Sequence, residues 1–170
     1  MSTRQGGGGD PVAVARDVVL RQLTAAPRSR AQLEQKLAEK GVPEEAAGQV
    51  LDRFTEVGLV DDAAYAEVLV RSQRLTRGLG RRGLAHELRA KGVDDATAAA
   101  ALEQVDDEAE EASARGLVER RLRSMSSLAP EVQTRRLAGM LARKGYPQGL
   151  VMRVVREAVR SESEQLEQED

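Results

Sequence analysis

The sequence predicts an all-α fold of three tandem three-helix repeats that form an elongated, modular array. One ten-residue pattern occurs three times, at offsets of 51 and 53 residues. No segment alternates between apolar and polar residues in the way that a half-buried strand does. The apolar residues are mostly Leu, Val and Ala, with one Phe, two Tyr and no Trp, and such small side chains fill the narrow gaps between helices well.

The repeated pattern predicts the end of a helix. Each copy reads Leu-x-x-x-Leu-x-x-Lys-Gly followed by a hydrophobic residue, and the copies begin at Leu33, Leu84 and Leu137. Leucines four residues apart lie on one helix face. A glycine in the left-handed conformation ends the helix, and the negative end of the helix dipole favours the lysine before it. We therefore expect the hydrophobic residue to pack against the second leucine, and the helices to end at Gly41, Gly92 and Gly145.

In each repeat, one helix precedes this pattern and another follows it. The preceding helices are predicted at about residues 12–25, 62–77 and 107–126. Proline at the first helical position, or acidic residues near the positive end of the dipole, signal the following helices at Pro43, Asp94-Asp95 and Pro147. On the helix at 62–77, the residues expected to share one face are Tyr65, Val68, Leu69, Ser72 and Leu75.

These helices divide the chain into five segments. The repeats occupy residues 12–59, 60–105 and 106–160, and each has a core small enough to depend on its neighbours. A Gly-rich segment, 1–11, and an acidic segment, 161–170, flank the repeats. Both are predicted to be disordered because they contain few apolar residues.

The composition provides few of the side chains that usually carry out catalysis. Without cysteine the chain has no disulfide, no thiolate nucleophile and no zinc–thiolate site, and one histidine provides no usual catalytic triad and no multi-histidine metal site. No apolar run approaches the roughly 18 residues of a membrane span, and the N-terminus lacks the apolar core of a secretory signal. We therefore expect a cytoplasmic protein that is not an enzyme, binds no cofactor or metal and does not associate with a membrane.

The segment from Gly78 to Gly83 has the Gly-x-Gly-x-x-Gly spacing of a dinucleotide-binding turn. Such a turn requires a preceding strand within a βαβ unit. A 16-residue amphipathic helix precedes it instead, and the spacing does not recur in the other two repeats. We therefore reject a dinucleotide site and interpret the glycines as a turn between two helices.

Basic residues are concentrated between residues 71 and 91, where seven bases accompany one acid although the whole chain has a net charge of -2. Acids are nearly absent at the i±4 positions, so these arginines are predicted to lack local partners. This favours contact with DNA phosphate or an acidic protein over an ordinary solvated helix face. A second basic group lies in the third repeat. The residues predicted to bind a partner are Arg71, Arg74, Arg77, Arg81, Arg82, Arg89, Lys91, Arg135, Arg136, Arg143 and Lys144.

Two helices joined by a tight turn also suggest a helix-turn-helix DNA reader. The helices after the turns begin EEAAGQ, DATAAA and QGLVMR, and the first two offer few side chains for base edges. Sequence-specific reading is therefore disfavoured, whereas binding through phosphates is compatible with the sequence. The lone His86 is interpreted as a surface or boundary residue, and Tyr65 and Tyr146 as core or boundary aromatics.

One combination of motifs resembles the RecX family of recombination regulators. It consists of Asp61-Asp62-x-x-Tyr65-Ala66, Arg71-Ser72-x-Arg74, Gly80 and Leu84-x-x-Glu87-Leu88-x-x-Lys91-Gly92-Val93. The resemblance is densest over residues 60–102 and looser in the first and third repeats. One departure is Gly83, where the family typically has a basic residue; Arg81 and Arg82 are the nearest residues that supply this charge.

The resemblance implies a regulator that binds RecA in the groove of the RecA–DNA filament. It implies inhibition of the recombinase and of its ATPase activity, with roles in DNA recombination, DNA repair and the SOS response. An elongated array with a basic face agrees with this function, and we expect a monomer. The alternative is a nucleic-acid-binding helical module that contacts the phosphates of single- or double-stranded DNA without RecA.

Overall fold

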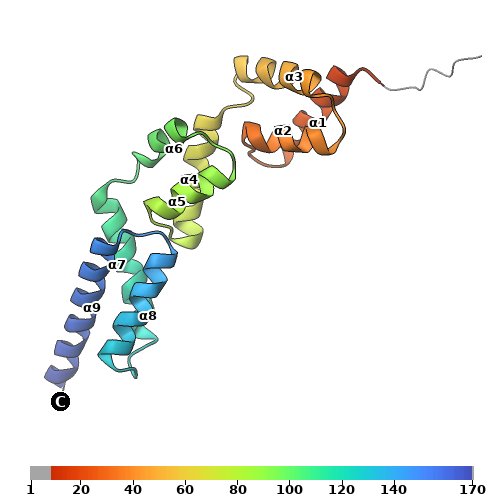
Figure 1. The fold of residues 1–170 in the computed structure, drawn as a ribbon. Coiled ribbons are helices and arrows are strands. Elements are labelled where there is room, and N and C mark those ends of the chain that lie inside the picture. Colours follow the sequence, from red (N-terminus) through yellow and green to blue (C-terminus); the bar gives the residue numbers. More distant parts are fainter. Residues whose placement is uncertain (1–8, 170) are drawn as a thin grey trace, which may run out of the picture.

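The computed structural model describes residues 9–169 of the 170-residue chain. This part forms nine helices and no strand, which confirms the all-α prediction. Three groups of three helices follow one another along an elongated molecule, with the first and last helices at opposite ends (Figure 1). The helices are α1 (Pro11–Ala25), α2 (Arg30–Glu39), α3 (Glu44–Glu56), α4 (Asp62–Arg77), α5 (Arg81–Ala90), α6 (Asp95–Leu102), α7 (Asp107–Arg123), α8 (Pro130–Arg143) and α9 (Gln148–Glu169).

Each repeat has its own hydrophobic core, so the array is modular as predicted. The helix pairs that pack extensively are within α1–α3, within α4–α6 or within α7–α9. The pattern leucines lie at the centre of the three cores and are at most 1% exposed. Burying one such leucine contributes roughly 1.5–3 kcal/mol, and few apolar contacts connect one core to the next.

The predicted helix ends are confirmed at all three copies of the pattern. The glycines have positive φ angles, +73° at Gly41, +77° at Gly92 and +87° at Gly145. The backbone N–H after each glycine donates to the carbonyl of the second leucine, at 3.0, 3.1 and 3.2 Å. This is the bond that closes a helix through a left-handed glycine.

The helix starts follow the predicted signals with one shift. Asp61, Asp94 and Asp106 cap α4, α6 and α7, each accepting a backbone N–H of the first turn. Pro43 lies one residue before α3, as its N-cap, and Pro147 directly precedes α9. Both prolines therefore precede the first helical position instead of occupying it.

The residues predicted to share one face of α4 do not all lie on its buried side. Tyr65 and Leu69 do contact the core, and the other residues of the buried face of α4 are Ala66 and Val70. In contrast, Val68 is 40% exposed and Leu75 is 88% exposed. The buried face of α4 differs from the predicted one because α4 packs against both α5 and α6. Sequence spacing alone does not show on which side of α4 these two helices lie.

The acidic segment predicted to be disordered from residue 161 continues α9 as helix to Glu169. None of the described residues after Val159 is buried, so the extension is not held by the core. Local contacts support it, among them a 3.1 Å bond from the Ser163 hydroxyl to the Val159 carbonyl and the ion pair of Arg160 with Glu164. Elongating an existing helix avoids the cost of nucleation. In the predicted N-terminal segment 1–11, residues 1–8 lie outside the described part, and α1 already begins at Pro11.

Candidate functional site

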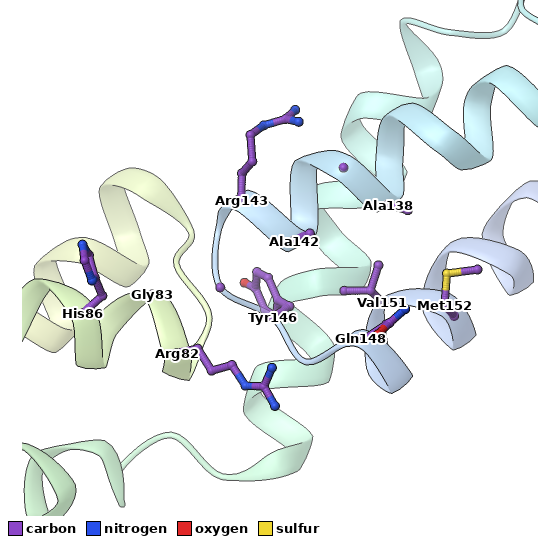
Figure 2. A pocket seen from close by; sticks show the side chains of 12 residues that line it. Arg82, Gly83, His86, Ala138, Ala142, Arg143, Tyr146, Gln148, Val151 and Met152 are labelled. Atoms are coloured by element: carbon purple, nitrogen blue, oxygen red, sulfur yellow. The ribbon is translucent and has the colours of Figure 1, made fainter.

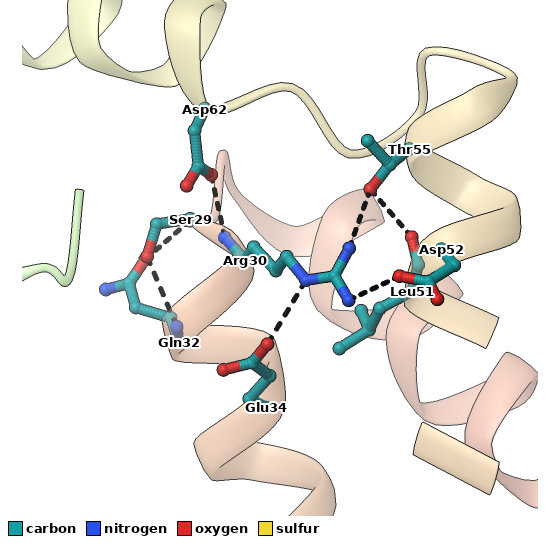
Figure 3. A network of polar contacts seen from close by, with 8 residues as sticks. All are labelled: Ser29, Arg30, Gln32, Glu34, Leu51, Asp52, Thr55 and Asp62. Carbon is teal, nitrogen blue, oxygen red and sulfur yellow. Dashed lines mark hydrogen bonds and ion pairs between the residues drawn. The ribbon is translucent and has the colours of Figure 1, made fainter. Parts of the chain in front are cut away.

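The first joint between repeats forms where the end of α5 meets the start of α2. The hydroxyl of Ser29, the N-cap of α2, donates a 2.5 Å hydrogen bond to the Lys91 carbonyl. The backbone N–H of Arg30 donates a 2.8 Å bond to the Asp62 carboxylate at the start of α4 (Figure 3). Two helices of repeat 2 therefore hold the first turn of α2.

The side chain of Arg30 stays within its own repeat. Its guanidinium donates to Asp52 at 2.7 Å, to Glu34 at 3.1 Å and to Thr55 at 3.3 Å (Figure 3). The hydrogen bond to Asp52 is the largest of the causes that raise the pKa of Arg30. This network fixes the start of α2 against α3. Repeat 2 therefore packs against a part of repeat 1 whose position is well defined.

The second joint has the same arrangement between the end of α8 and the start of α5. The Arg81 backbone N–H donates a 2.7 Å bond to Glu110 of α7, a side chain that is only 1% exposed. Neighbouring N–H groups of α5 donate to the last carbonyls of α8, from Gly80 to Lys144 at 2.9 Å and from Arg82 to Gly145 at 3.2 Å.

The two joints share three features. The carbonyl end of one repeat's second helix meets the N–H end of the preceding repeat's second helix, so that opposite ends of two helix dipoles attract. The first helical residue is arginine in both cases, at Arg30 and Arg81. Its backbone N–H donates to a carboxylate from the first helix of the next repeat. The Lys-Gly pairs of the second and third copies therefore end a helix and also connect two repeats.

Gly78, Gly80 and Gly83 have two separate functions, and the prediction that all three form the turn is wrong for Gly83, which lies inside α5. Gly78 forms the turn, with a φ of +62°. Gly80 and Gly83 allow the end of α8 to approach: a Cβ at Gly80 would lie 2.8 Å from the Gly145 carbonyl oxygen, and one at Gly83 would overlap the Lys144 carbonyl oxygen. A helix precedes the segment, as predicted, and the departure from the family pattern at Gly83 provides space for the joint.

The expectation that the arginines of residues 71–91 lack acidic partners is wrong for three of them. Their partners lie on other helices, between 6 and 29 residues away in the sequence, which i±4 spacing does not reveal. Arg81 pairs with the buried Glu110 and with Asp107, whose hydrogen bond is the main cause of the raised pKa of Arg81. The other two ion pairs are Arg77 with Glu87 at 2.9 Å and Arg89 with Asp95 at 3.8 Å.

Two predicted lysines also contribute to the joints. The Lys144 ammonium donates a 2.6 Å bond to the Arg77 carbonyl at the end of α4, and the Lys91 carbonyl accepts the bond from Ser29. The hydroxyl of Tyr146 donates a 2.8 Å bond to the Gly78 carbonyl beside them. Burial raises the pKa of Tyr146 to about 12.

A hollow of about 620 Å³, here called the joint pocket, opens beside the second joint. Arg82 and His86 of α5 border it from repeat 2, and Arg143 borders it from α8. Figure 2 shows Arg82 and Arg143 on opposite sides of Tyr146. Neither arginine forms an ion pair within residues 9–169.

A second hollow of about 460 Å³, here called the arginine hollow, lies between α7 and α8. Its lining includes Arg121, Arg135, Arg136 and Arg143. All four side chains are exposed, and none forms an ion pair with a carboxylate of the described chain. The structure thus brings together three predicted residues with Arg121, which the sequence analysis missed. The run Arg120–Arg123 was visible, but its spacing does not indicate which arginine faces α8.

The two remaining predicted residues lie on α4 and line neither hollow. Arg71 is exposed, and Arg74 is half-buried with its guanidinium 3.5 Å from the Ser113 hydroxyl of α7. His86 is exposed, whereas Tyr65 and Tyr146 are buried, as expected. Across residues 9–169, no three metal-ligating side chains cluster into a metal site. No helix in this range has the length and apolar character needed to cross a membrane.

Comparison with known proteins agrees with this architecture. Models of the first, second and third three-helix domains of RecX match residues 15–54, 61–102 and 108–155. The regulatory protein RecX of Streptomyces coelicolor is 52% identical over 158 residues, which cover 93% of this chain and 84% of the relative. That of Thermobifida fusca is 52% identical over 153 residues, covering 90% and 83%.

A solved structure has the same fold. The crystal structure of RecX from Lactobacillus salivarius superposes with a TM-score of 0.80 at 22% identity, over 89% of this chain and 98% of that chain. The three domain matches follow the three repeats in order and together cover more than half of the chain. With relatives 52% identical over most of their length, the chain belongs to the RecX family of regulatory proteins.

Proposed function

We propose that this protein binds RecA and the RecA–DNA filament and inhibits its recombinase and ATPase activities. It acts in the cytoplasm as a regulator without catalytic activity of its own, and so modulates DNA recombination and repair. Family membership supports a regulatory role, since the relatives are named regulatory protein RecX.

The observation that carries the proposal is the arginine hollow. Four arginine residues line one depression, and no carboxylate of the described chain pairs with them. A guanidinium is always charged and matches carboxylate or phosphate with two parallel hydrogen bonds. Such a cluster is suited to a polyanionic surface, and a filament of protein on DNA offers both phosphates and carboxylates.

The shape of the molecule supports contact with more than one subunit of a filament. The arginine hollow lies in repeat 3, whereas Arg71 lies on α4 of repeat 2, beyond the second joint. An elongated array of small repeats presents an extended surface to its partner. Binding along the filament groove would block strand exchange or further growth.

Co-sedimentation with RecA filaments on single-stranded DNA tests the binding. The test variant carries Arg121→Glu, Arg135→Glu and Arg136→Glu. The matched control carries Arg16→Glu, Arg21→Glu and Arg53→Glu, which change the charge equally on exposed positions of repeat 1. We expect wild type and control to sediment with filaments and the test variant to stay in the supernatant. Equal sedimentation of two folded variants would contradict the assignment of this surface.

The alternative function is a helical module that binds nucleic acid without RecA. The arginine hollow favours it as a second candidate, because phosphates alone would satisfy its charges. Titration of bare single- and double-stranded DNA at two salt concentrations distinguishes the two functions. Tight binding that weakens steeply with salt, in the absence of RecA, would favour the alternative. Weak binding to bare DNA together with tight binding to filaments would favour the RecA regulator.

A further inference from the structure

The joint pocket combines an apolar floor with a basic border. Twelve residues line it, and none is acidic. The apolar floor is formed by Ala138, Ala142, Tyr146, Val151 and Met152. The border carries Arg82, His86, Arg143 and Gln148. A hollow of about 620 Å³ with a few polar groups around an apolar surface is typical of a binding site.

The two neighbouring arginines at the start of α5 differ in how the fold uses them. Arg81 is held by Glu110 and Asp107 inside the second joint. Arg82 donates its backbone N–H to the joint, but its side chain is exposed at the border of the joint pocket and has no ion pair in the described chain. Folding therefore uses the backbone of Arg82 and leaves its charge for a ligand.

The chemistry of the floor favours a protein ligand over a nucleic acid. Bases bind single-strand sites by stacking on exposed aromatic rings. The one aromatic residue of the joint pocket, Tyr146, is only 3% exposed, and its hydroxyl is bonded to Gly78.

We infer that the joint pocket binds a protein segment in which an apolar side chain is flanked by carboxylates. The apolar side chain occupies the floor, and the carboxylates pair with Arg82 on one side and Arg143 on the other. Because the lining comes from repeats 2 and 3, the bound segment also fixes the angle between them. Only one part of the inference rests on the proposed function, namely that the bound segment belongs to the protein that this chain regulates.

Fluorescence anisotropy with labelled eight-residue peptides tests the inference on the full chain. The probe is Gly-Asp-Glu-Leu-Phe-Glu-Asp-Gly. One control peptide replaces Leu-Phe by Ser-Ser, and another replaces each acid by its amide. We expect only the probe to bind wild type measurably. Binding of either control as tight as that of the probe, or no binding of the probe, would overturn the inference.

Three variants locate the binding. Arg82→Glu reverses the border charge and is expected to weaken probe binding about tenfold or more, the effect of losing a charge-assisted bond. Ala142→Leu fills the hollow from an exposed helix position and is expected to abolish binding. Arg21→Glu, an exposed arginine of repeat 1 outside the pocket, is expected to leave binding unchanged. Equal effects of Arg82→Glu and Arg21→Glu would overturn the assignment, as would displacement of the probe by a single-stranded oligonucleotide.

This experiment separates failure of the inference from failure of the proposed function. If wild type sediments with RecA filaments but does not bind the probe, the pocket assignment is wrong and the function stands. If the probe binds as expected but the protein does not associate with RecA filaments, the proposed function is wrong and the pocket stands as a site for another partner.

Discussion

At the scale of single residues, Arg81 and Arg82 provide the sharpest contrast in the molecule. The guanidinium of Arg81 is 37% exposed and pairs with a carboxylate that is 1% exposed. We expect Arg81→Ala to lower the free energy of unfolding by about 1 kcal/mol or more, because the buried carboxyl group of Glu110 loses this partner. Arg82→Ala is expected to change it by less than about 0.5 kcal/mol. Urea titrations followed by circular dichroism compare them, and a larger loss for Arg82→Ala would contradict these roles.

Tyr146 makes stability dependent on pH in the alkaline range. Burial raises its pKa to about 12 in the folded chain, whereas an unfolded tyrosine titrates near pH 10. The stabilisation is complete below the unfolded pKa and is lost as pH rises toward the folded pKa. The free energy of unfolding should therefore fall by about 1 kcal/mol between pH 9 and 11 on account of this residue. Urea titrations at both pH values should show a smaller fall in Tyr146→Phe, and equal falls would contradict the shift.

Gly83 tests the close approach of α8 to α5. Its substitution by alanine would push a Cβ into the Lys144 carbonyl oxygen, so we expect Gly83→Ala to open the second joint while the helices remain. Because the chain has no cysteine, a label pair at Arg71→Cys and Arg156→Cys reports the distance between repeats 2 and 3. The control is Gly116→Ala, whose nearest neighbour would lie 3.7 Å away. An unchanged distance distribution in Gly83→Ala would contradict this role.

At the scale of helices, the helix ends were predictable from the sequence, whereas the ion-pair partners of the arginines were not. A helix end depends on groups within five residues, such as the Val93 N–H and the Leu88 carbonyl, and the sequence shows them side by side. The partners of Arg81 lie 26 and 29 residues further along the chain. Arg121 joins Arg135 and Arg136 only because α7 packs beside α8. A charge count along the chain therefore located basic segments without showing which of their charges the fold neutralises.

The extension of α9 is the clearest case in which composition misled. Low apolar content predicted disorder, but Glu, Gln and Leu are good helix formers, and no glycine or proline ends the helix after Val159. We expect deletion of residues 161–170 to reduce the helical circular dichroism signal while changing the free energy of unfolding by less than about 0.5 kcal/mol, since none of the residues 161–169 is buried. A loss of 2 kcal/mol or more would indicate that this segment packs on the protein.

At the scale of the whole molecule, the start of the second helix of repeat 3 differs from the two helix starts that form joints. The start of α8 carries Pro130 at its first helical position, and proline has no backbone N–H to donate. The bond that Arg30 and Arg81 make to the next repeat is therefore absent there.

The repeated joint also accounts for the distribution of charge over the array. Carboxylates from α4 and α7 are used where repeats meet, and Asp95 and Glu87 neutralise two more arginines of repeat 2. The unpaired arginines of the arginine hollow remain in repeat 3, with Arg82 facing the joint pocket. A surface of this kind is suited to a large anionic partner.

Inhibition of the DNA-dependent ATPase of RecA is the most direct test of the proposed function and of the role of the arginine hollow. Increasing amounts of wild type, of the triple variant at Arg121, Arg135 and Arg136, and of the matched triple variant in repeat 1 are added to RecA on single-stranded DNA. We predict strong inhibition by wild type and by the repeat 1 variant, and at least tenfold weaker inhibition by the arginine-hollow variant. Equal inhibition by all three folded proteins, or no inhibition by wild type, would contradict it.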